Sequence, residues 1–581
     1  MLRSKPALGA EGSLETRCDL VRTGLKILLL SFLGLGCGKA SGDAPAGEAH
    51  EAGSNAGGGG PTEGGNSGRG GSGGGVPGGS GTGGESELSD VDLTGTPIYT
   101  RVQRLTNRQW ENAVSDILHF QQPHELSAAF LAPLAGVTTF DNNERVLFVD
   151  PQRFIDFEAG AEAAAAVATG TAEALAALYT GDDAPGFVRV FGRRAFRRPL
   201  TTDEETKYQN VFARGEQLYG AGFAQGAALV VRAMLQSPHF LYRTELGPAD
   251  DPLSAYELAS KLSFWLLGTT PSESLLDAAA AGTLASTEAL VSTARQMLED
   301  PRAIAVMRDF HGQLLHVAYL ESISKSLPEF DPAINSELGL ASNAFFDLIF
   351  GQNFGLRELL TSKQAYVGPG LAPFYGLKVP AGRLELRDVG PARSGYFMQV
   401  PFLMLWSSNT QTSPIERGSQ LERALLCGPE RPSPLNVIPS LPVVANQTTR
   451  QRTTQLTASC GATCHSYIDP LGFAFENFDG LGKQRELDNG QPIDTTGVYP
   501  LAEGVASFAD GNELMKVLAN STQVHTCYSK HLTSYALGRD LAESDRPVLE
   551  SLGKVSQSQS LKELIVALVQ GPMFRTRKDG L

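Results

Sequence analysis

Apolar residues recur every three or four positions along most of the chain after residue 100, which is the spacing of one face of an α-helix. After Trp110, for example, Val114 and Ile117 fall on one such face. Segments with this spacing are 159–178, 225–237, 288–300, 302–320, 341–350, 511–519 and 561–571. The pattern predicts a mainly α protein with a multi-helix body of several small helical domains.

Four predicted helix starts carry a capping box, in which a Ser or Thr and a Glu or Gln three residues later bond to each other's backbone N–H. The boxes are Thr106–Gln109, Thr201–Glu204, Ser254–Glu257 and Thr270–Glu273. In the last box, Pro271 would take the first helical position, where a missing N–H costs nothing. We expect a helix to begin at each box.

Strand signals are few. Residues 365–367 and the apolar stretch Ser394–Trp406 are candidates for a short hairpin or loop. Several prolines from Pro429 to Pro442 predict extended chain between the helical bulk and the tail that contains most of the cysteines.

The N-terminal part differs from the rest. Arg22 and Lys26 precede an apolar run, Ile27–Gly36, which is too short to span a bilayer and is typical of a signal peptide. The run ends at Cys37, in a context similar to a bacterial lipoprotein box, so we expect Cys37 to be lipidated. Ordinary signal cleavage is the alternative.

Residues after Cys37 are almost wholly Gly, Ser, Ala, Glu and Pro, which predicts a disordered tether. The predicted organisation is a signal peptide and lipobox (1–37), a linker (38–92), an N-terminal helical domain (95–160), an Arg-rich helical domain (180–246), a central helical domain (252–380), a cysteine-motif domain (390–495) and a C-terminal helical domain (503–578).

Charge and targeting together limit the partners. The net charge of −15 over 581 residues argues against nucleic acid. The signal and lipobox predict an exported lipoprotein, periplasmic or at the cell surface, that is held to a membrane by its N-terminal lipid.

Cysteine usage points to the last third of the chain. Once Cys18 leaves with the signal and Cys37 takes lipid, four of the six cysteines remain. An exported protein is expected to pair such thiols or to use them. The remaining four are Cys427, Cys460, Cys464 and Cys527.

One interpretation is a covalently attached haem. Cys460-Gly-Ala-Thr-Cys464-His465 provides the two thiols and the imidazole that a c-type haem requires, with one residue more than the usual Cys-x-x-Cys-His spacing. In this scheme Cys460 and Cys464 bind the porphyrin, and His465 is the proximal ligand of the haem iron. Cys427 and Cys527 then form a disulfide.

Two other schemes fit the same residues. The four cysteines can form two disulfides, with His465 as a bystander, because residues four apart on a helical turn lie within disulfide distance. Alternatively, Cys427, Cys460, Cys464 and either His465 or Cys527 ligate zinc, although structural zinc favours reducing compartments.

Two further groups of residues have plainer interpretations. The basic segment Arg193–Arg198 is a candidate anion site, but pairing with acidic neighbours on facing helices is favoured. His311 and His316 are five residues apart rather than the four that a shared metal prefers, so we interpret them as packing or surface residues. No hydrolase, metalloprotease or Walker motif is present, and no catalytic residue is indicated.

Longer segments carry a family resemblance over about residues 98–577. The chain resembles large exported proteins of planctomycetes and myxobacteria that are built from a series of domains of unknown function and are described as cytochrome-like. The segments that carry the resemblance are Arg104–Trp110, Phe191–Leu200, Leu235–Arg243, Leu258–Leu266, Thr412–Gly418, Ile468–Asp479 and Tyr535–Arg539.

The resemblance implies a mostly helical exported module with one haem c and a cytochrome-c-like C-terminal part. Members carry Cys-x-x-Cys-His just before the segment that here begins at Ile468, and Cys460, Cys464 and His465 fall on those positions. The expected function is an electron carrier, or the haem component of an oxidoreductase, with a redox partner protein. The candidate distal ligands are Met398, Met404, Met515, His525, His531 and Met573.

The alternative function is a non-catalytic surface protein. Under this hypothesis the body is a disulfide-braced helical scaffold that binds a polymer or a partner protein, and Cys460, Cys464 and His465 are structural.

Overall fold

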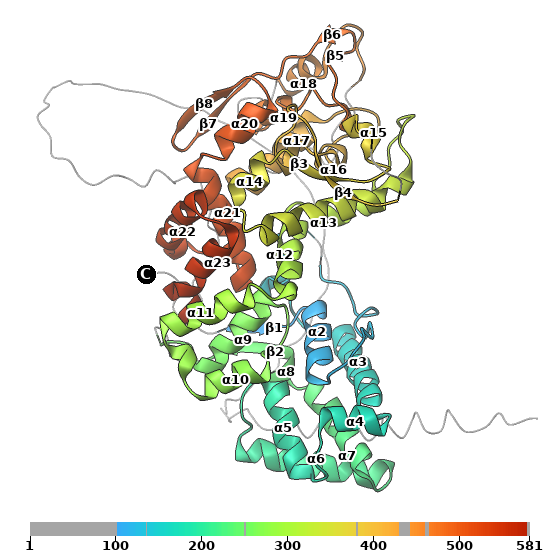
Figure 1. The fold of residues 1–581 in the computed structure, drawn as a ribbon, viewed down its shortest axis with the longest axis vertical. Coiled ribbons are helices and arrows are strands. Elements are labelled where there is room, and N and C mark those ends of the chain that lie inside the picture. Colours follow the sequence, from blue (N-terminus) through green and yellow to red (C-terminus); the bar gives the residue numbers. More distant parts are fainter. Residues whose placement is uncertain are drawn as a thin grey trace, which may run out of the picture. The chain divides into compact units, whose positions relative to one another are not determined.

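The computed structural model describes residues 101–134, 136–248, 251–378, 382–428, 442–458 and 464–577. It is 59% helical and 8% strand, which confirms the mainly α prediction (Figure 1). The predicted signal peptide, the tether, Cys37 and Cys460 lie outside the described residues. Within the described ranges no helix is both long and apolar enough to cross a membrane.

The first helical group is closed by a strand pair. β1 and β2 are antiparallel, with Arg101 opposite Glu245, so the two ends of the group lie side by side. Within the group α7 packs against α3, α5 and α6. Its elements are β1 (Arg101–Arg104), α2 (Asn107–Ile117), η1 (Glu144–Val146), α3 (Pro151–Thr169), α4 (Ala172–Leu178), α5 (Ala184–Phe196), α6 (Thr202–Tyr219), α7 (Phe223–Leu235), α8 (Pro238–Leu241) and β2 (Tyr242–Glu245).

The central part is also helical, with one hairpin formed by β3 and β4. Its elements are α9 (Ala255–Leu266), α10 (Glu273–Ala280), η2 (Thr283–Ala285), α11 (Thr287–Met297), α12 (Pro301–Leu314), η3 (Val317–Ser322), η4 (Pro332–Ile334), α13 (Asn335–Gly351), α14 (Leu356–Thr361), β3 (Gln364–Val367), α15 (Ala372–Tyr375), β4 (Glu385–Asp388), η5 (Tyr396–Met398), α16 (Val400–Leu405), α17 (Pro414–Leu421) and the π-helical η6 (Glu422–Leu426).

The C-terminal part combines short hairpins with five described helices that follow α19. Its elements are α18 (Thr449–Thr457), α19 (Ser466–Phe473), β5 (Leu487–Asp488), β6 (Gln491–Pro492), β7 (Gly497–Leu501), β8 (Gly504–Phe508), α20 (Gly511–Leu518), α21 (Thr522–Leu537), η8 (Glu543–Asp545), α22 (Arg546–Ser558), α23 (Leu561–Gln570) and α24 (Pro572–Arg575). α22 packs against both α21 and α23.

Three of the four predicted capping boxes are confirmed, at the starts of α2, α6 and α9. The box at Thr270–Glu273 is wrong. Ser272 caps α10 by accepting a hydrogen bond from the backbone N–H of Leu275, so Glu273 is the first helical residue.

The two strand candidates have different outcomes. Residues 365–367 lie in β3 and pair with β4. The expectation of hairpin or loop structure for Ser394–Trp406 is wrong over most of its length, because η5 and α16 occupy it. All residues of η5 and most of α16 are buried, so the segment shows an apolar run without the period that would have indicated a helix.

Helix α21 lies at the centre of the C-terminal part and was not predicted. Nearly all of its residues are buried, including Ser, Thr, His and Tyr residues. It packs against α22, η6 and α12. A polar helix that is buried on every side has no apolar stripe, which is why its spacing gave no signal.

Helices α17 and α19 approach each other at backbone distance. A Cβ atom placed on Gly472 would lie 1.9 Å from the carbonyl oxygen of Pro414, and one placed on Gly418 would lie 2.0 Å from that of Ile468. Only glycine fits at either position, so the two helices are held at a separation that a single methyl group would change.

We predict that Gly472→Ala lowers the free energy of unfolding by about 1–3 kcal/mol, because the new methyl group collides with backbone that cannot move independently. Urea unfolding measures the effect. The matched control is Gly312→Ala in α12, where a Cβ meets nothing within 4 Å. That variant should gain up to about 1 kcal/mol from reduced backbone entropy, and an equal loss in both variants would contradict the prediction.

A buried histidine joins α12 to α21. The Nδ1–H of His311 donates to the carbonyl oxygen of Met307 at 2.8 Å, and Nε2 accepts from the hydroxyl of Tyr528 at 2.8 Å. Burial lowers the pKa of His311 to about 4. The folded protein therefore keeps this imidazole neutral at pH values where the unfolded chain binds a proton.

We predict that stability falls as the pH is lowered from about 6.5, the ordinary histidine pKa, towards 4, because only the unfolded state takes up the His311 proton in that window. The stabilising contribution is complete above 6.5 and is lost towards 4. In His311→Gln the slope of unfolding free energy against pH should shrink by up to about 1.4 kcal/mol per pH unit. Identical slopes in the two proteins, measured by urea unfolding, would refute this.

Candidate functional site

The described half of the cysteine motif lies at the start of α19. Cys464 is a free, partly exposed thiol, and His465 directly precedes the helix. Nδ1 of His465 lies 2.8 Å from Oδ1 of Asp469, one helical turn further on. Cys460 lies outside the described residues, so the structure places Cys464 and His465 next to each other and does not test the position of Cys460.

Asp469 is itself held in place. Its side chain is buried, and Oδ2 accepts a hydrogen bond from the hydroxyl of Thr457 in α18 at 3.1 Å. A carboxylate only accepts hydrogen bonds, so Nδ1 of His465 carries the proton in this pair. The lone pair of Nε2 is then the one offered to a ligand, as in metal sites where a carboxylate orients the imidazole.

The surroundings of this pair come from the hairpin of β7 and β8 and from α18. The hairpin packs against α19, and the ring of Tyr467 meets that of Tyr499 edge to face, with centroids 6.4 Å apart. Arg450 of α18 lies over the ring of Phe473 at 4.8 Å. Sequence reasoning missed Asp469 as the partner of His465, although the spacing of four residues was a usable signal.

Arg417 fixes the turn that follows α19. Its guanidinium is fully buried and lies 3.8 Å from Glu476, which also accepts hydrogen bonds from Thr412 and Arg485. Burial lowers the pKa of Arg417 to about 10, so the side chain remains charged at neutral pH. Arg417 donates to the carbonyl oxygens of Leu403, Phe475, Phe478 and Asp479.

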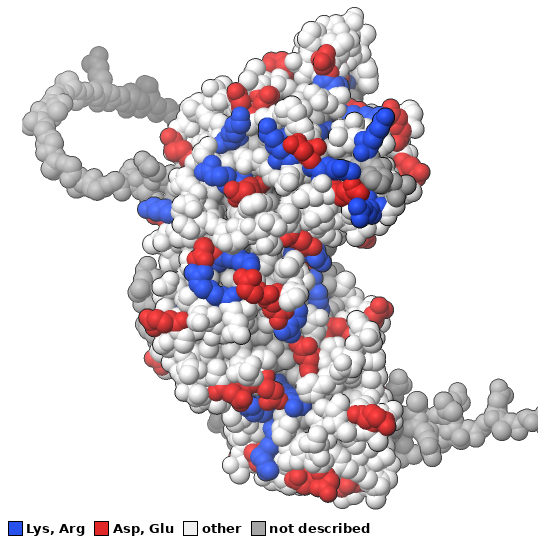
Figure 2. Space-filling view, viewed as in Figure 1, with Lys and Arg blue, Asp and Glu red and all other residues white. Residues whose placement is uncertain are grey.

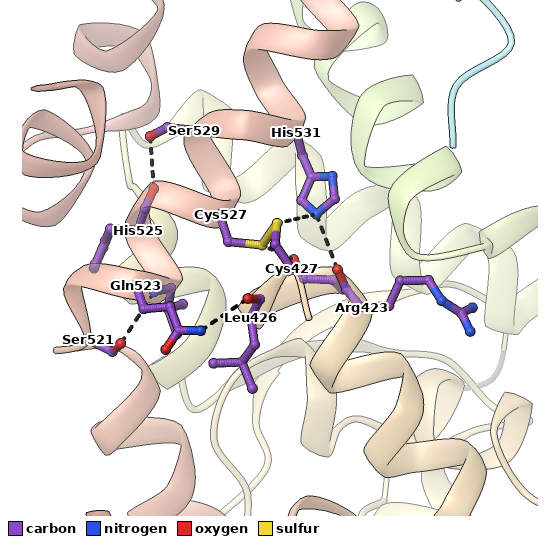
Figure 3. The surroundings of a disulfide bond; sticks show 11 residues. Arg423, Leu426, Cys427, Ser521, Gln523, His525, Cys527, Ser529 and His531 are labelled. Atoms are coloured by element: carbon purple, nitrogen blue, oxygen red, sulfur yellow. Dashed lines mark hydrogen bonds between the residues drawn. A yellow bond between two sulfur atoms is a disulfide. The ribbon is translucent and has the colours of Figure 1, made fainter. Parts of the chain in front are cut away.

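The structure contains a disulfide between Cys427, at the end of η6, and Cys527, in α21 (Figure 3). The Cα atoms are 5.5 Å apart, and the two residues are 100 positions apart in sequence. This is the pair that accompanies the haem in the first scheme. It leaves no thiolate of Cys427 for the zinc set with Cys460 and Cys464.

The candidate distal ligands are all engaged elsewhere in the structure. Nδ1 of His525 lies 2.8 Å from the hydroxyl of Ser556, and Nε2 donates to the carbonyl oxygen of Ala519. His531 lies beside the disulfide, and burial lowers its pKa to about 3. At most 1% of each methionine is exposed, and all belong to the hydrophobic core: Met398, Met404, Met515 and Met573.

Two arginines of the basic segment Arg193–Arg198 form ion pairs, which is the interpretation that the sequence analysis favoured. Arg193 contacts Glu273 and Asp277, and Arg194 also contacts Glu273. Arg197 is buried and donates to backbone carbonyl oxygens near α8. Lys and Arg are interspersed with Asp and Glu over the face shown in Figure 2, which is unlike the single-signed surface that binds nucleic acid.

The packing interpretation of the histidines in and after α12 is also confirmed. His311 is fully buried between two hydrogen-bond partners. The ring of His316 stacks on that of Tyr319, with centroids 5.6 Å apart.

Comparison with known families covers most of the described chain. Five families match in succession, each described as a protein of unknown function. They are DUF1587 (residues 103–170), DUF1595 (183–245), DUF1592 (253–377), DUF1588 (393–488) and DUF1585 (505–574). The chain is thus similar to five families of unknown function, in succession, over most of its described length. No curated protein and no solved structure matches it.

The fourth match is the one that bears on the site. It contains the whole cysteine motif, Arg417 and Cys427, whereas Cys527 belongs to the fifth match. The disulfide therefore links two adjacent matched regions.

We predict that Arg417→Met lowers the free energy of unfolding by about 3–5 kcal/mol, because it removes the hydrogen bonds to four carbonyl oxygens and the buried positive charge that lies 3.8 Å from Glu476. The control is Arg383→Met, which removes an ion pair whose arginine side chain is 77% exposed. This variant should cost less than about 1 kcal/mol. If urea unfolding showed similar losses of unfolding free energy for the two variants, the stabilising role of the buried Arg417 would be refuted.

Proposed function

We propose that the chain is an exported, lipid-tethered protein with a single haem c. In this proposal Cys460 and Cys464 form thioether bonds to the porphyrin, and His465 is the proximal ligand of the iron. The observation that carries it is the pair of His465 and Asp469, in which Nδ1 contacts the carboxylate and Nε2 lies on the other side of the ring.

The donor set fits a haem. Two thiols and an adjacent imidazole are the groups that covalent attachment requires, and the described thiol, Cys464, is free and partly exposed. The disulfide uses the other two cysteines of the body, so Cys460 and Cys464 remain for the cofactor. The additional residue in the loop is compatible with attachment because the loop only has to bring both sulfur atoms to the porphyrin edge.

The chain's own residues would tune the site. Haem supplies one-electron chemistry when bound. Asp469 would increase the electron donation of His465 by accepting a hydrogen bond from its Nδ1–H, and this would favour the oxidised state of a bound iron. Thr457 and the close contact of α17 with α19 hold Asp469 and the imidazole in a fixed orientation.

Electron transfer with a redox partner protein, or service as the haem component of an oxidoreductase, is the role that follows. The predicted signal sequence and lipobox support a location at a membrane, in the periplasm or at the cell surface, with Cys37 carrying the lipid. The tether would let the body reach its partner while it remains anchored.

The buried disulfide also supports a second candidate function, a non-catalytic surface protein that binds a polymer or another protein. Cys427 and Cys527 brace η6 against α21 regardless of any cofactor. In that case Cys460 and Cys464 form a second disulfide and the protein is colourless.

Haem content distinguishes the two functions. We predict that the full chain, produced in a host with cytochrome c maturation, retains a Soret band after denaturation and acid–acetone extraction, because the thioether bonds are covalent. Cys464→Ala should lose most of this covalent absorbance. The control is Thr454→Ala, which removes only a hydroxyl that bonds to the carbonyl oxygen of Arg450 in α18. That control should keep the absorbance.

If no Soret band is found, an assay of free thiols identifies the state of the cysteines. A colourless protein with no free thiols would exclude the haem and establish the two-disulfide alternative. A haem that is fully extracted by acid–acetone from the unaltered protein would also reject the covalent proposal.

A further inference from the structure

A second sulfur and nitrogen cluster lies apart from the cysteine motif. Nε2 of His531 is 3.5 Å from Sγ of Cys427 (Figure 3). The two sulfur atoms of the disulfide and a ring nitrogen of His531 all lie within 4.8 Å of one another. The three side chains offer two sulfur atoms and one nitrogen, which could bind a metal ion once the sulfur–sulfur bond is broken and the thiolates separate.

Local structure explains why the three side chains converge. Cys527 and His531 are four residues apart on α21, so their side chains project from one face of the helix. Cys427 arrives from the other side, at the end of η6, where a backbone φ of 50° ends the π-helix and turns the chain. His531 also lies 3.3 Å from the carbonyl oxygen of Arg423 in η6, which orients its ring (Figure 3).

We propose that Cys427, Cys527 and His531 bind one divalent ion of the zinc class when the disulfide is reduced. Two thiolates and one imidazole are a donor set that zinc prefers. The two negative charges of the thiolates balance the charge of the ion, so the occupied site can stay buried without an unpaired charge. The disulfide and the metal site are thus alternative states of one cluster.

The chemistry balances with a dithiol as the reductant. The dithiol gives two electrons and two protons to the sulfur–sulfur bond, forming two protein thiols and its own disulfide. Binding of the ion to both thiols releases two protons. In the disulfide form the Nε2–H of His531 donates to the carbonyl oxygen of Arg423. Binding of the ion moves the ring proton to Nδ1, so that the lone pair of Nε2 binds the ion in place of this hydrogen bond.

A cavity gives the ion a path and a fourth position. It has a volume of about 520 Å³. His531 and Gly428, the residue after Cys427, both line it, as does His316. A solvent molecule in this cavity would be the fourth ligand. Three protein ligands with an open fourth position are typical of reactive rather than purely structural zinc.

The test uses the full chain with Cys460→Ser and Cys464→Ser, so that the cysteine motif cannot contribute thiolates. The protein is reduced by a dithiol under nitrogen, desalted and titrated with Co²⁺ alone. We expect one equivalent to produce thiolate-to-cobalt charge-transfer absorption and the visible bands of tetrahedral cobalt. The same protein without reduction should show neither.

His531→Asn is the decisive variant. It should weaken Co²⁺ binding by about 10-fold or more. Loss of a residue that only orients a metal ligand already has an effect of this size. His525→Asn, on the same helix but bonded to Ser556 and Ala519, is the control and should bind as before.

Co²⁺ binding can be tested even if reduction of the disulfide partly unfolds the protein. Should far-ultraviolet circular dichroism show loss of helix, recovery of helix on adding Co²⁺ supports the site, because binding then drives folding. Absence of charge-transfer absorption in the reduced protein overturns the proposal, as does equal affinity in the His531→Asn variant. The haem proposal is unaffected by either result, since its cysteines are absent from the test protein.

Discussion

The buried guanidinium of Arg417 is the constraint on which the candidate site depends. It donates hydrogen bonds to four carbonyl oxygens, and two of these, those of Phe475 and Asp479, also accept from backbone N–H groups. Those carbonyls belong to α16 and to the turns after α19, so one side chain joins three segments. The same helix, α17, meets α19 at Gly418 and Gly472. Charge and close backbone packing together fix the helix that His465 precedes.

Buried polar groups play a similar part elsewhere. Arg197 donates to backbone carbonyl oxygens around α8, and Arg101 donates to the carbonyl oxygen of Leu537 at the end of α21. Such contacts join segments far apart in sequence, as His311 and Tyr528 join α12 to α21. A buried arginine with satisfied donors specifies its neighbours more narrowly than an apolar contact of similar area, because several hydrogen bonds must be aligned at once.

The two sulfur centres are distinguished by their surroundings. Cys427 and Cys527 are buried between η6 and α21, where the disulfide braces two matched regions. Cys464 is partly exposed, beside an imidazole whose Nδ1 is already paired with a carboxylate. A free thiol next to an oriented imidazole suits cofactor attachment, whereas a buried sulfur pair suits bracing. This contrast, more than the spacing of the motif, favours the haem proposal.

The sequence by itself determined the helical class and three helix starts, because capping boxes and apolar spacing are local signals. It favoured ion pairing for the Arg193–Arg198 segment, but only the tertiary structure identified Glu273 and Asp277 as partners. It also indicated Cys464 and His465 as candidate cofactor-binding residues. Only the tertiary structure decided what depends on contacts between distant segments. The helix α21, the donor role of Arg417 and the approach of His531 to Cys427 are of this kind. Their residues are polar and buried, so no periodic pattern marks them, and their partners are fixed only when the chain has folded.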